Sequence, residues 1–196
     1  SVRKIGDEEL FMNMAQKNIK LYQDKGVKKI ITTSPHCYHT YTQEYPEFGG
    51  EFEVVHYTRL LAELIEKGTV KLSKTLDKKV AYHDPCYLGR HSEVYDEPRA
   101  LINAATGDNL VEMERSREKS LCCGAGGGRL WMETPPEWRF SDLRIHEALK
   151  PEQPFWQRHV LTASPCWKTA ERPSTRKTRL RSRTSPSLLP RRCNNP

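Results

Sequence analysis

Apolar residues recur at helical spacing near the start of the chain. Residues 8–25 place leucine, isoleucine and methionine between polar side chains, with acidic residues first, a lysine last and Gly26 directly afterwards. This pattern predicts one amphipathic helix that the glycine ends. Residues 27–32 form a short β-branched run and predict a strand. Pro35 forbids its continuation, because proline has no N–H to donate to a ladder.

Strand-like and helix-like segments alternate through the next hundred residues. Further strands are predicted at 51–56 and 79–83, an extended segment at 109–113, and helices at 57–67, 96–105 and 138–149. This alternation favours an α/β fold with a mostly parallel sheet and flanking helices. No apolar run approaches the ~20 residues of a membrane span. The N-terminus resembles no secretory signal, and its lack of Met leads us to expect a fragment or a processed chain.

Three segments share one local plan. Residues 30–38, 80–87 and 160–167 each run from an apolar strand through a small or acidic residue and a proline to a cysteine and an aromatic residue. The cysteines are Cys37, Cys86 and Cys166. If the strands are parallel, all three leave a sheet at its carboxyl edge, where open α/β sheets bind ligands. We therefore expect cysteine-bearing loops at the carboxyl ends of strands.

Charge is unevenly distributed along the chain. The formal net charge is +7, yet residues 151–196 hold 10 basic and 2 acidic side chains, which leaves 22 basic and 23 acidic residues before them. From about residue 168 the sequence is rich in Arg, Ser, Thr and Pro. Three interpretations stay open: a disordered basic tail, a reading frame that slipped after residue 150, and a nucleic-acid-binding arm.

The adjacent pair Cys122-Cys123, followed by a glycine-rich run to Gly128, is the most unusual feature. Neighbouring residues of a strand point to opposite faces, so two adjacent thiols converge only in a turn. Glycine supplies the backbone freedom for such a turn, and freed N–H groups can donate to cluster sulfides. The apolar residues that follow, Trp131 and Met132, are expected to be core contacts of the next helix.

Two interpretations of the cysteines remain. A single Cys86 far from the doublet suits an iron–sulfur cluster better than zinc, because structural zinc sites usually show two short Cys-x-x-Cys pairs. The alternative is a doublet that only supports the fold of a zinc-stapled or metal-free interaction module, with Cys37 and Cys86 as ordinary buried thiols.

Charged and titratable residues accompany the cysteines. His36 and His83 are candidates for a hydrogen bond to a metal ligand or for a proton source, or are simply hydrogen-bonded at strand ends. Arg90 and Arg129 would offset the negative charge of a cluster, bind an anionic substrate or stay solvated.

These motifs resemble the cysteine-rich CCG domain family, typified by the catalytic subunit of heterodisulfide reductase and shared by iron–sulfur subunits of glycolate, lactate and glycerol-3-phosphate oxidoreductases. His-Asp-Pro-Cys-Tyr-Leu-Gly-Arg at 83–90 resembles the leading motif of a second copy, and Cys-Cys-Gly at 122–124 its doublet. Thr-Ser-Pro-His-Cys-Tyr at 33–38 resembles the closing motif of a first copy, with Ser34 in place of one cysteine. Ser164 replaces a cysteine in the second closing motif.

The resemblance implies an oxidoreductase that carries a [4Fe-4S] or non-cubane iron–sulfur cluster. It implies Cys86, Cys122 and Cys123 as ligands, with Cys166 and Cys37 as further candidates and Gly124, Gly126, Gly127, His83 and Arg90 as supporting residues. Such a domain passes single electrons to a disulfide, or between a flavin subunit and quinone. Catalytic residues are not identified.

The resemblance also implies an organisation. Residues 1–70 would be the C-terminal part of a first repeat, 71–167 the second, iron–sulfur-binding repeat, and 168–196 a basic tail, disordered or frame-shifted. We expect other subunits or upstream domains, ferredoxin-like or flavin-containing, as partners, and no nucleic acid. The expected location is cytoplasmic, peripheral to the membrane through a complex. A structural module and nucleic-acid binding through the tail remain the competing functions.

Overall fold

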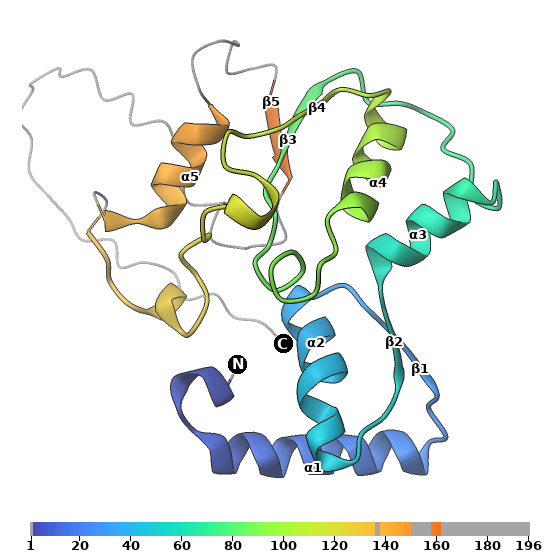
Figure 1. Cartoon of the computed structure of the whole chain (residues 1–196), viewed down its shortest axis with the longest axis vertical. Coiled ribbons are helices and arrows are strands. Elements are labelled where there is room, and N and C mark those ends of the chain that lie inside the picture. Colours follow the sequence, from blue (N-terminus) through green and yellow to red (C-terminus); the bar gives the residue numbers. More distant parts are fainter. Residues whose placement is uncertain (1, 136–137, 150–157, 162–196) are drawn as a thin grey trace, which may run out of the picture.

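The computed structural model describes residues 2–135, 138–149 and 158–161 (Figure 1). Its helices are α1 (Glu8–Asp24), α2 (Pro35–His39), α3 (Tyr57–Glu66), α4 (Asp96–Thr106) and α5 (Phe140–Ala148). Its strands are β1 (Lys29–Thr32), β2 (Glu53–His56), β3 (Lys79–Tyr82), β4 (Leu110–Val111) and β5 (Arg158–Leu161). Short 3₁₀ turns lie at Arg3–Ile5, Tyr45–Phe48, Arg117–Lys119 and Arg129–Trp131, and a π turn at Thr40–Glu44. Within these residues, no helix combines the length and the apolar character that a bilayer crossing requires.

The strands form two parallel sheets. β1 pairs with β2, and β3 lies between β4 and β5 with both neighbours parallel to it. The α/β class is confirmed, but the described strands make two short sheets instead of one. Figure 1 shows the first sheet with α1 and α2 at one end of the molecule, and β3 between α4 and α5 at the other. Ring contacts such as His36 with Tyr87, 4.3 Å apart, join the chain after β1 to the chain after β3.

The first helix follows the sequence pattern closely. The Asp7 side chain caps its start by accepting from the Leu10 N–H at 3.0 Å, and Gly26 follows its end in the left-handed conformation. Phe11, Ala15 and Ile19 recur at four-residue spacing and are buried. They pack with Tyr45 and so hold α1 against the turns that follow α2. The predicted helix at 8–25 is therefore confirmed to within one residue.

The central strand of the second sheet is buried on both faces, as parallel strands usually are. Val80 and Tyr82 pack against Ile102 of α4, and Ala81 packs on the opposite face against Met113 and Ala148 of α5. Every residue of the strand after Lys79 is buried. The residues that follow β3 therefore continue from a strand that packing on both faces holds in place.

Two segments differ from the prediction. Helical turns occupy residues 35–48, where the sequence indicated only the end of a strand; the Ser34 side chain caps α2 and Pro35 takes its first position, which suits both residue types. The prediction that Trp131 and Met132 are core contacts is wrong, since they are 85% and 65% exposed. The left-handed glycines just before Arg129 redirect the chain outward.

The loop after β3 is packed against the first sheet. Leu88 and Val94 form a buried cluster with Tyr38 of α2, and Val54 of β2 joins it. Gly89 lies within this loop, and a Cβ there would sit 2.6 Å from Cε1 of Tyr95. Only glycine allows so close an approach between the loop and the Tyr95 ring.

We expect Gly89→Ala to lower the free energy of unfolding by about 1–3 kcal/mol, the usual cost of forcing a methyl group into a packed site. Gly126→Ala is the matched control, because a Cβ at Gly126 meets no atom within 4 Å. Urea denaturation of both variants measures the difference. Equal stabilities for the two variants would contradict the packing described for Gly89.

Candidate metal centre

Cys86 lies on a tight turn just beyond β3. Pro85 begins this turn, and its carbonyl accepts from the N–H of Leu88 at 3.0 Å and of Gly89 at 2.8 Å. The Cys86 carbonyl accepts from His91 N–H at 3.1 Å, which closes the loop. The thiol is half-buried. The backbone therefore holds it at the carboxyl end of the central strand, as the sequence predicted for this residue.

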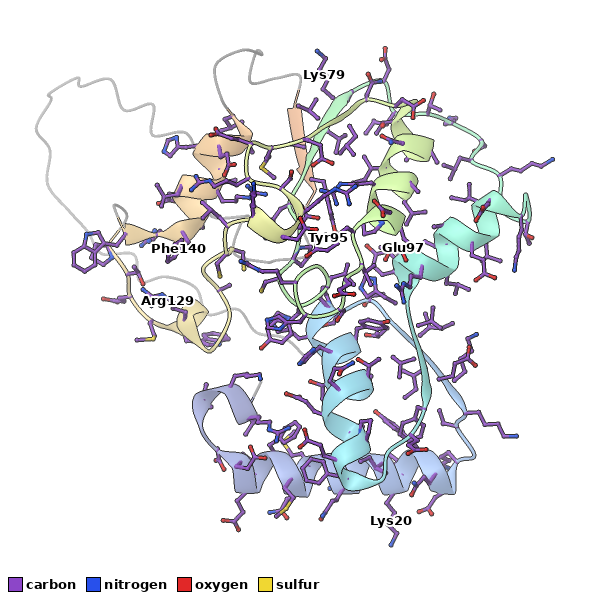
Figure 2. All side chains as sticks on the ribbon, viewed as in Figure 1. Lys20, Lys79, Tyr95, Glu97, Arg129 and Phe140 are labelled. Atoms are coloured by element: carbon purple, nitrogen blue, oxygen red, sulfur yellow. The ribbon has the colours of Figure 1, made fainter. Side chains whose placement is uncertain are left out.

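The doublet Cys122-Cys123 lies in an irregular segment that Gly124 ends with a positive φ of 79°. The Gly124 N–H donates to Sγ of Cys122 at 3.3 Å. A Cβ at Gly124 would approach Cβ of Phe140 to 3.2 Å, so the turn passes close to the start of α5. Figure 2 shows Arg129 and Phe140 on the segment that leads from the glycines into this helix. Adjacent thiols thus sit in a turn, and the N–H that follows them points toward sulfur.

The thiols act on one another electrostatically. A hydrogen bond from Cys123 lowers the pKa of Cys122 to about 5; burial opposes this shift, and the Gly124 N–H and the charges of Arg90 and Arg129 add to it. Burial raises the pKa of Cys86, and the charge of Cys122 raises it further. Cys122 is therefore a thiolate at neutral pH, the form that attacks electrophiles and binds metals.

The donor set suits a thiolate-ligated group. Among the cysteines that the structure describes none forms a disulfide. Cys86, just beyond β3, and Cys122 and Cys123, in the segment after Ser120, are all half-buried. Within the described ranges, however, no three His, Cys, Asp or Glu side chains already converge as a closed metal site. Cys123 nevertheless donates a hydrogen bond to Cys122, and the charge of Cys122 acts on Cys86.

Two further ligand candidates were predicted, Cys37 and Cys166. Cys37 is exposed on α2, beyond β1. Cys166 and the tail from 168 to 196 lie outside the described residues. Gly126 and Gly127 belong to the same glycine-rich turn as the doublet.

A buried arginine joins the strand end to the doublet. Arg144 of α5 is 0% exposed and donates to His83 Nδ1 at 3.1 Å, to Ser120 Oγ at 3.1 Å and to Glu147 Oε2 at 2.9 Å. It also donates to the carbonyl of Arg115 at 2.6 Å. Its guanidinium thereby links β3, the segment before Cys122 and α5.

A second buried arginine holds the neighbouring aspartate. Arg99 of α4 donates to both carboxylate oxygens of Asp84, at 2.7 and 2.9 Å. The same carboxylate accepts from the Arg117 N–H at 2.8 Å, and Ser120 Oγ donates to the Asp84 carbonyl at 3.3 Å. Such bidentate pairs fix geometry as well as charge. Sequence reasoning missed both arginines, although His-Asp at a buried strand end signals that charged partners must come from elsewhere.

His83 is held in one protonation state. A guanidinium can only donate, so Nδ1 of His83 is an acceptor and the proton sits on Nε2. Burial, and then the charge of Arg144, lower the pKa of His83 to about 4. The structure therefore favours the hydrogen-bonded strand-end histidine over a proton source at neutral pH.

Aromatic rings join the two cysteine-bearing loops. Tyr87 lies between His36 of α2 and His91 of its own loop, with centroids 4.3 and 4.7 Å away, and His39 meets its edge at 5.1 Å. Burial lowers the pKa of His36 and of His39. Neutral imidazoles suit this stacking, because charged rings would repel one another.

Comparison with known proteins identifies what the chain is similar to. The family model for the CCG cysteine-rich domain matches residues 2–41 and 80–166. The chain is 48% identical over 147 residues to the probable iron-sulfur-binding oxidoreductase FadF of Bacillus subtilis, covering 75% of this chain and 21% of that protein. It is 47% identical over 133 residues to the EtfAB:quinone oxidoreductase of Syntrophomonas wolfei, covering 68% and 18%.

A third relative belongs to the dihydromethanophenazine:CoB–CoM heterodisulfide reductase of Methanosarcina barkeri, of which it is one subunit. It is 39% identical over 124 residues, covering 62% of this chain and 30% of that protein. The chain spans about a fifth of the length of the first two relatives. No solved structure was found to match it. The resemblance drawn from the motifs is confirmed.

The buried state of His83 predicts a pH dependence of stability. Its pKa is about 4 in the folded chain and about 6.5 in an unfolded one. Between these values the unfolded chain binds more protons, so the free energy of unfolding falls as the pH falls through this window, by about 3 kcal/mol at pH 4. In His83→Gln, whose amide oxygen can still accept from Arg144, that part of the decline disappears. Urea denaturation of the metal-free protein at pH 7 and pH 4 measures it; an identical decline in the variant would contradict the assignment.

The Cys122 thiolate predicts selective alkylation. In the metal-free protein, the iodoacetamide reaction of Cys122 reaches half its maximal rate near pH 5, whereas Cys86 requires a pH above the ordinary thiol value of about 8.5. Peptide mass spectrometry separates the two sites. Cys123→Ala moves the Cys122 midpoint upward because it removes the donor, while Cys123→Ser keeps a hydroxyl donor and retains more of the shift. An ordinary thiol profile for Cys122 would refute this description.

Proposed function

The chain belongs to the CCG cysteine-rich domain family, and we propose that it is an iron–sulfur electron-transfer domain of an oxidoreductase. One observation supports the proposal: Ser120, two residues before the doublet Cys122-Cys123, donates through Oγ to the carbonyl of Asp84, two residues before Cys86 at the end of β3. The charge of Cys122 also acts on Cys86. The names of the relatives also support this function, since one is a probable iron-sulfur-binding oxidoreductase and another is a subunit of a heterodisulfide reductase.

The proposed ligands are Cys86, Cys122 and Cys123, with Cys166 as the fourth candidate. The proposed group is a [4Fe-4S] or non-cubane cluster, which supplies one-electron reduction when bound. Three thiols with one N–H donor to sulfur resemble the environment in which such clusters are held. The names of the relatives support iron and sulfur but do not distinguish between the two cluster types.

The residues around the thiols have separate tasks. Asp84 with Arg99, and Ser120 with Arg144, fix the two cysteine-bearing segments relative to each other. The turn that begins at Pro85 holds Cys86 just beyond the carboxyl end of β3. Burial of these groups excludes water from the inner side of the thiols, which strengthens every charge interaction there.

The names of the relatives suggest two routes for the electrons. Their names include a quinone oxidoreductase and a heterodisulfide reductase. We propose that this domain passes single electrons to a disulfide or relays them between a flavin-containing subunit and quinone, together with other subunits or upstream domains. A complex at the cytoplasmic face of a membrane would suit either route.

We further propose that residues 1–70 are the closing part of one repeat and 71–167 a second repeat. The internal repetition supports this: β1 leads through Pro35 to Cys37, as β3 leads through Pro85 to Cys86, and both strands lie in parallel sheets.

Anaerobic reconstitution with iron and sulfide tests the function. We expect the wild-type protein to become brown, with iron and sulfide in equal amounts and an electron paramagnetic resonance signal on reduction. Ala substitution of Cys86, Cys122 or Cys123 removes most of the bound iron, because each takes away a proposed ligand. Cys37→Ala is the matched control and keeps it, since Cys37 is exposed on α2 and belongs neither to the loop of Cys86 nor to the segment of the doublet.

Two results would reject the proposal. The first is a colourless protein with stoichiometric zinc, which favours a structural module. The second is equal iron loss in the Cys37 control and the three ligand variants, which indicates nonspecific binding to thiols.

A further inference from the structure

Arg90 bridges the two segments that carry the candidate ligands. It ends the loop of Cys86, and its Nη2 donates to the carbonyl of Ser120 at 3.1 Å. Ser120 stands two residues before Cys122 in the chain. One flexible, cationic side chain therefore crosses from the first thiol's loop to the segment of the doublet.

On the basis of the proposed iron–sulfur function, we propose that the positive charge of Arg90 raises the reduction potential of the cluster held by Cys86, Cys122 and Cys123. Reduction adds one electron and makes the cluster more negative by one unit, while the charge of Arg90 stays at +1. The guanidinium therefore attracts the reduced form more strongly than the oxidised form and favours reduction.

The charge of Arg90 reaches both sides of the site. Arg90 lies four residues after Cys86 in the same loop, and its guanidinium is hydrogen-bonded to the carbonyl of Ser120, two residues before Cys122. Its positive charge therefore acts on both cysteine-bearing segments. At an effective dielectric constant of about 20, one unit charge several ångströms away changes a charging equilibrium by roughly tenfold or more.

The fold does not depend on Arg90. Ser120 is buried and already bonded through its hydroxyl to Arg144 and to the carbonyl of Asp84. Arg90 itself is exposed. Removing its charge therefore leaves the segments in place and changes the potential around the sulfurs.

Redox titration of the reconstituted protein tests the inference. We expect Arg90→Gln to lower the midpoint potential by roughly 59 mV, a tenfold change in the equilibrium constant of one-electron reduction. Arg90→Lys keeps most of the wild-type potential because it keeps the charge. Lys119→Gln is the control: it removes an exposed cation directly before Ser120 and leaves the potential unchanged. The urea midpoint of all three variants stays at the wild-type value.

A second readout needs no cluster. In the metal-free protein at pH 8, the rate at which Cys122 reacts with an anionic aromatic disulfide is divided by its rate with neutral dithiodipyridine, both followed by peptide mass spectrometry. Arg90→Gln lowers this ratio by about threefold, because the local positive potential that attracts the anion is lost. The ratio does not depend on the thiolate fraction, since both reagents meet the same thiolate.

The outcomes separate the two proposals. A wild-type protein that assembles no cluster overturns the proposed function, and the reagent ratio then still decides whether the charge of Arg90 acts on the thiols. A cluster whose potential is the same in Arg90→Gln and in the wild type overturns the role of Arg90 alone. An equal fall of the midpoint potential in Arg90→Gln and Lys119→Gln also overturns the role of Arg90, because the effect would then come from the net charge of the protein.

Discussion

The whole site depends on charged groups buried at the carboxyl end of β3. Arg144 and Arg99 carry positive charge into the interior, where it would be costly without partners, and Glu147 and Asp84 supply the partners. Breaking such a buried pair typically costs about 3–5 kcal/mol, because the remaining charge is left uncompensated. The network cannot slide by a residue without losing its pairs. It therefore fixes the segments of Cys86 and Cys122 relative to each other.

The thiols differ in charge because their surroundings differ. Cys122 accepts hydrogen bonds from Cys123 and from the Gly124 N–H, which stabilise its thiolate, whereas Cys86 is held neutral by burial and by the nearby negative charge. One charged and one neutral sulfur can lie close together without strong repulsion. A bound cation would then displace the protons of both Cys86 and Cys123, since metal ligation requires thiolates.

Much of this arrangement could be predicted from the sequence, and the exceptions have physical reasons. Periodicity located α1, β3 and α4 to within a residue or two, because local pattern and burial agree there. The motif around Cys86 and the doublet located the candidate ligands. The partners of His83 and Asp84 could not be predicted, because Arg99 and Arg144 come from helices whose packing depends on the whole fold. Trp131 and Met132 are apolar yet exposed, so residue type alone was misleading.

Native mass spectrometry of the anaerobically purified chain tests the central claim most directly. We expect a mass above that of the polypeptide by the irons and sulfides of one cluster, and we expect this increment to be lost when Cys86 and the doublet are replaced together. The bare polypeptide mass, or an increment of a single zinc ion, would contradict it.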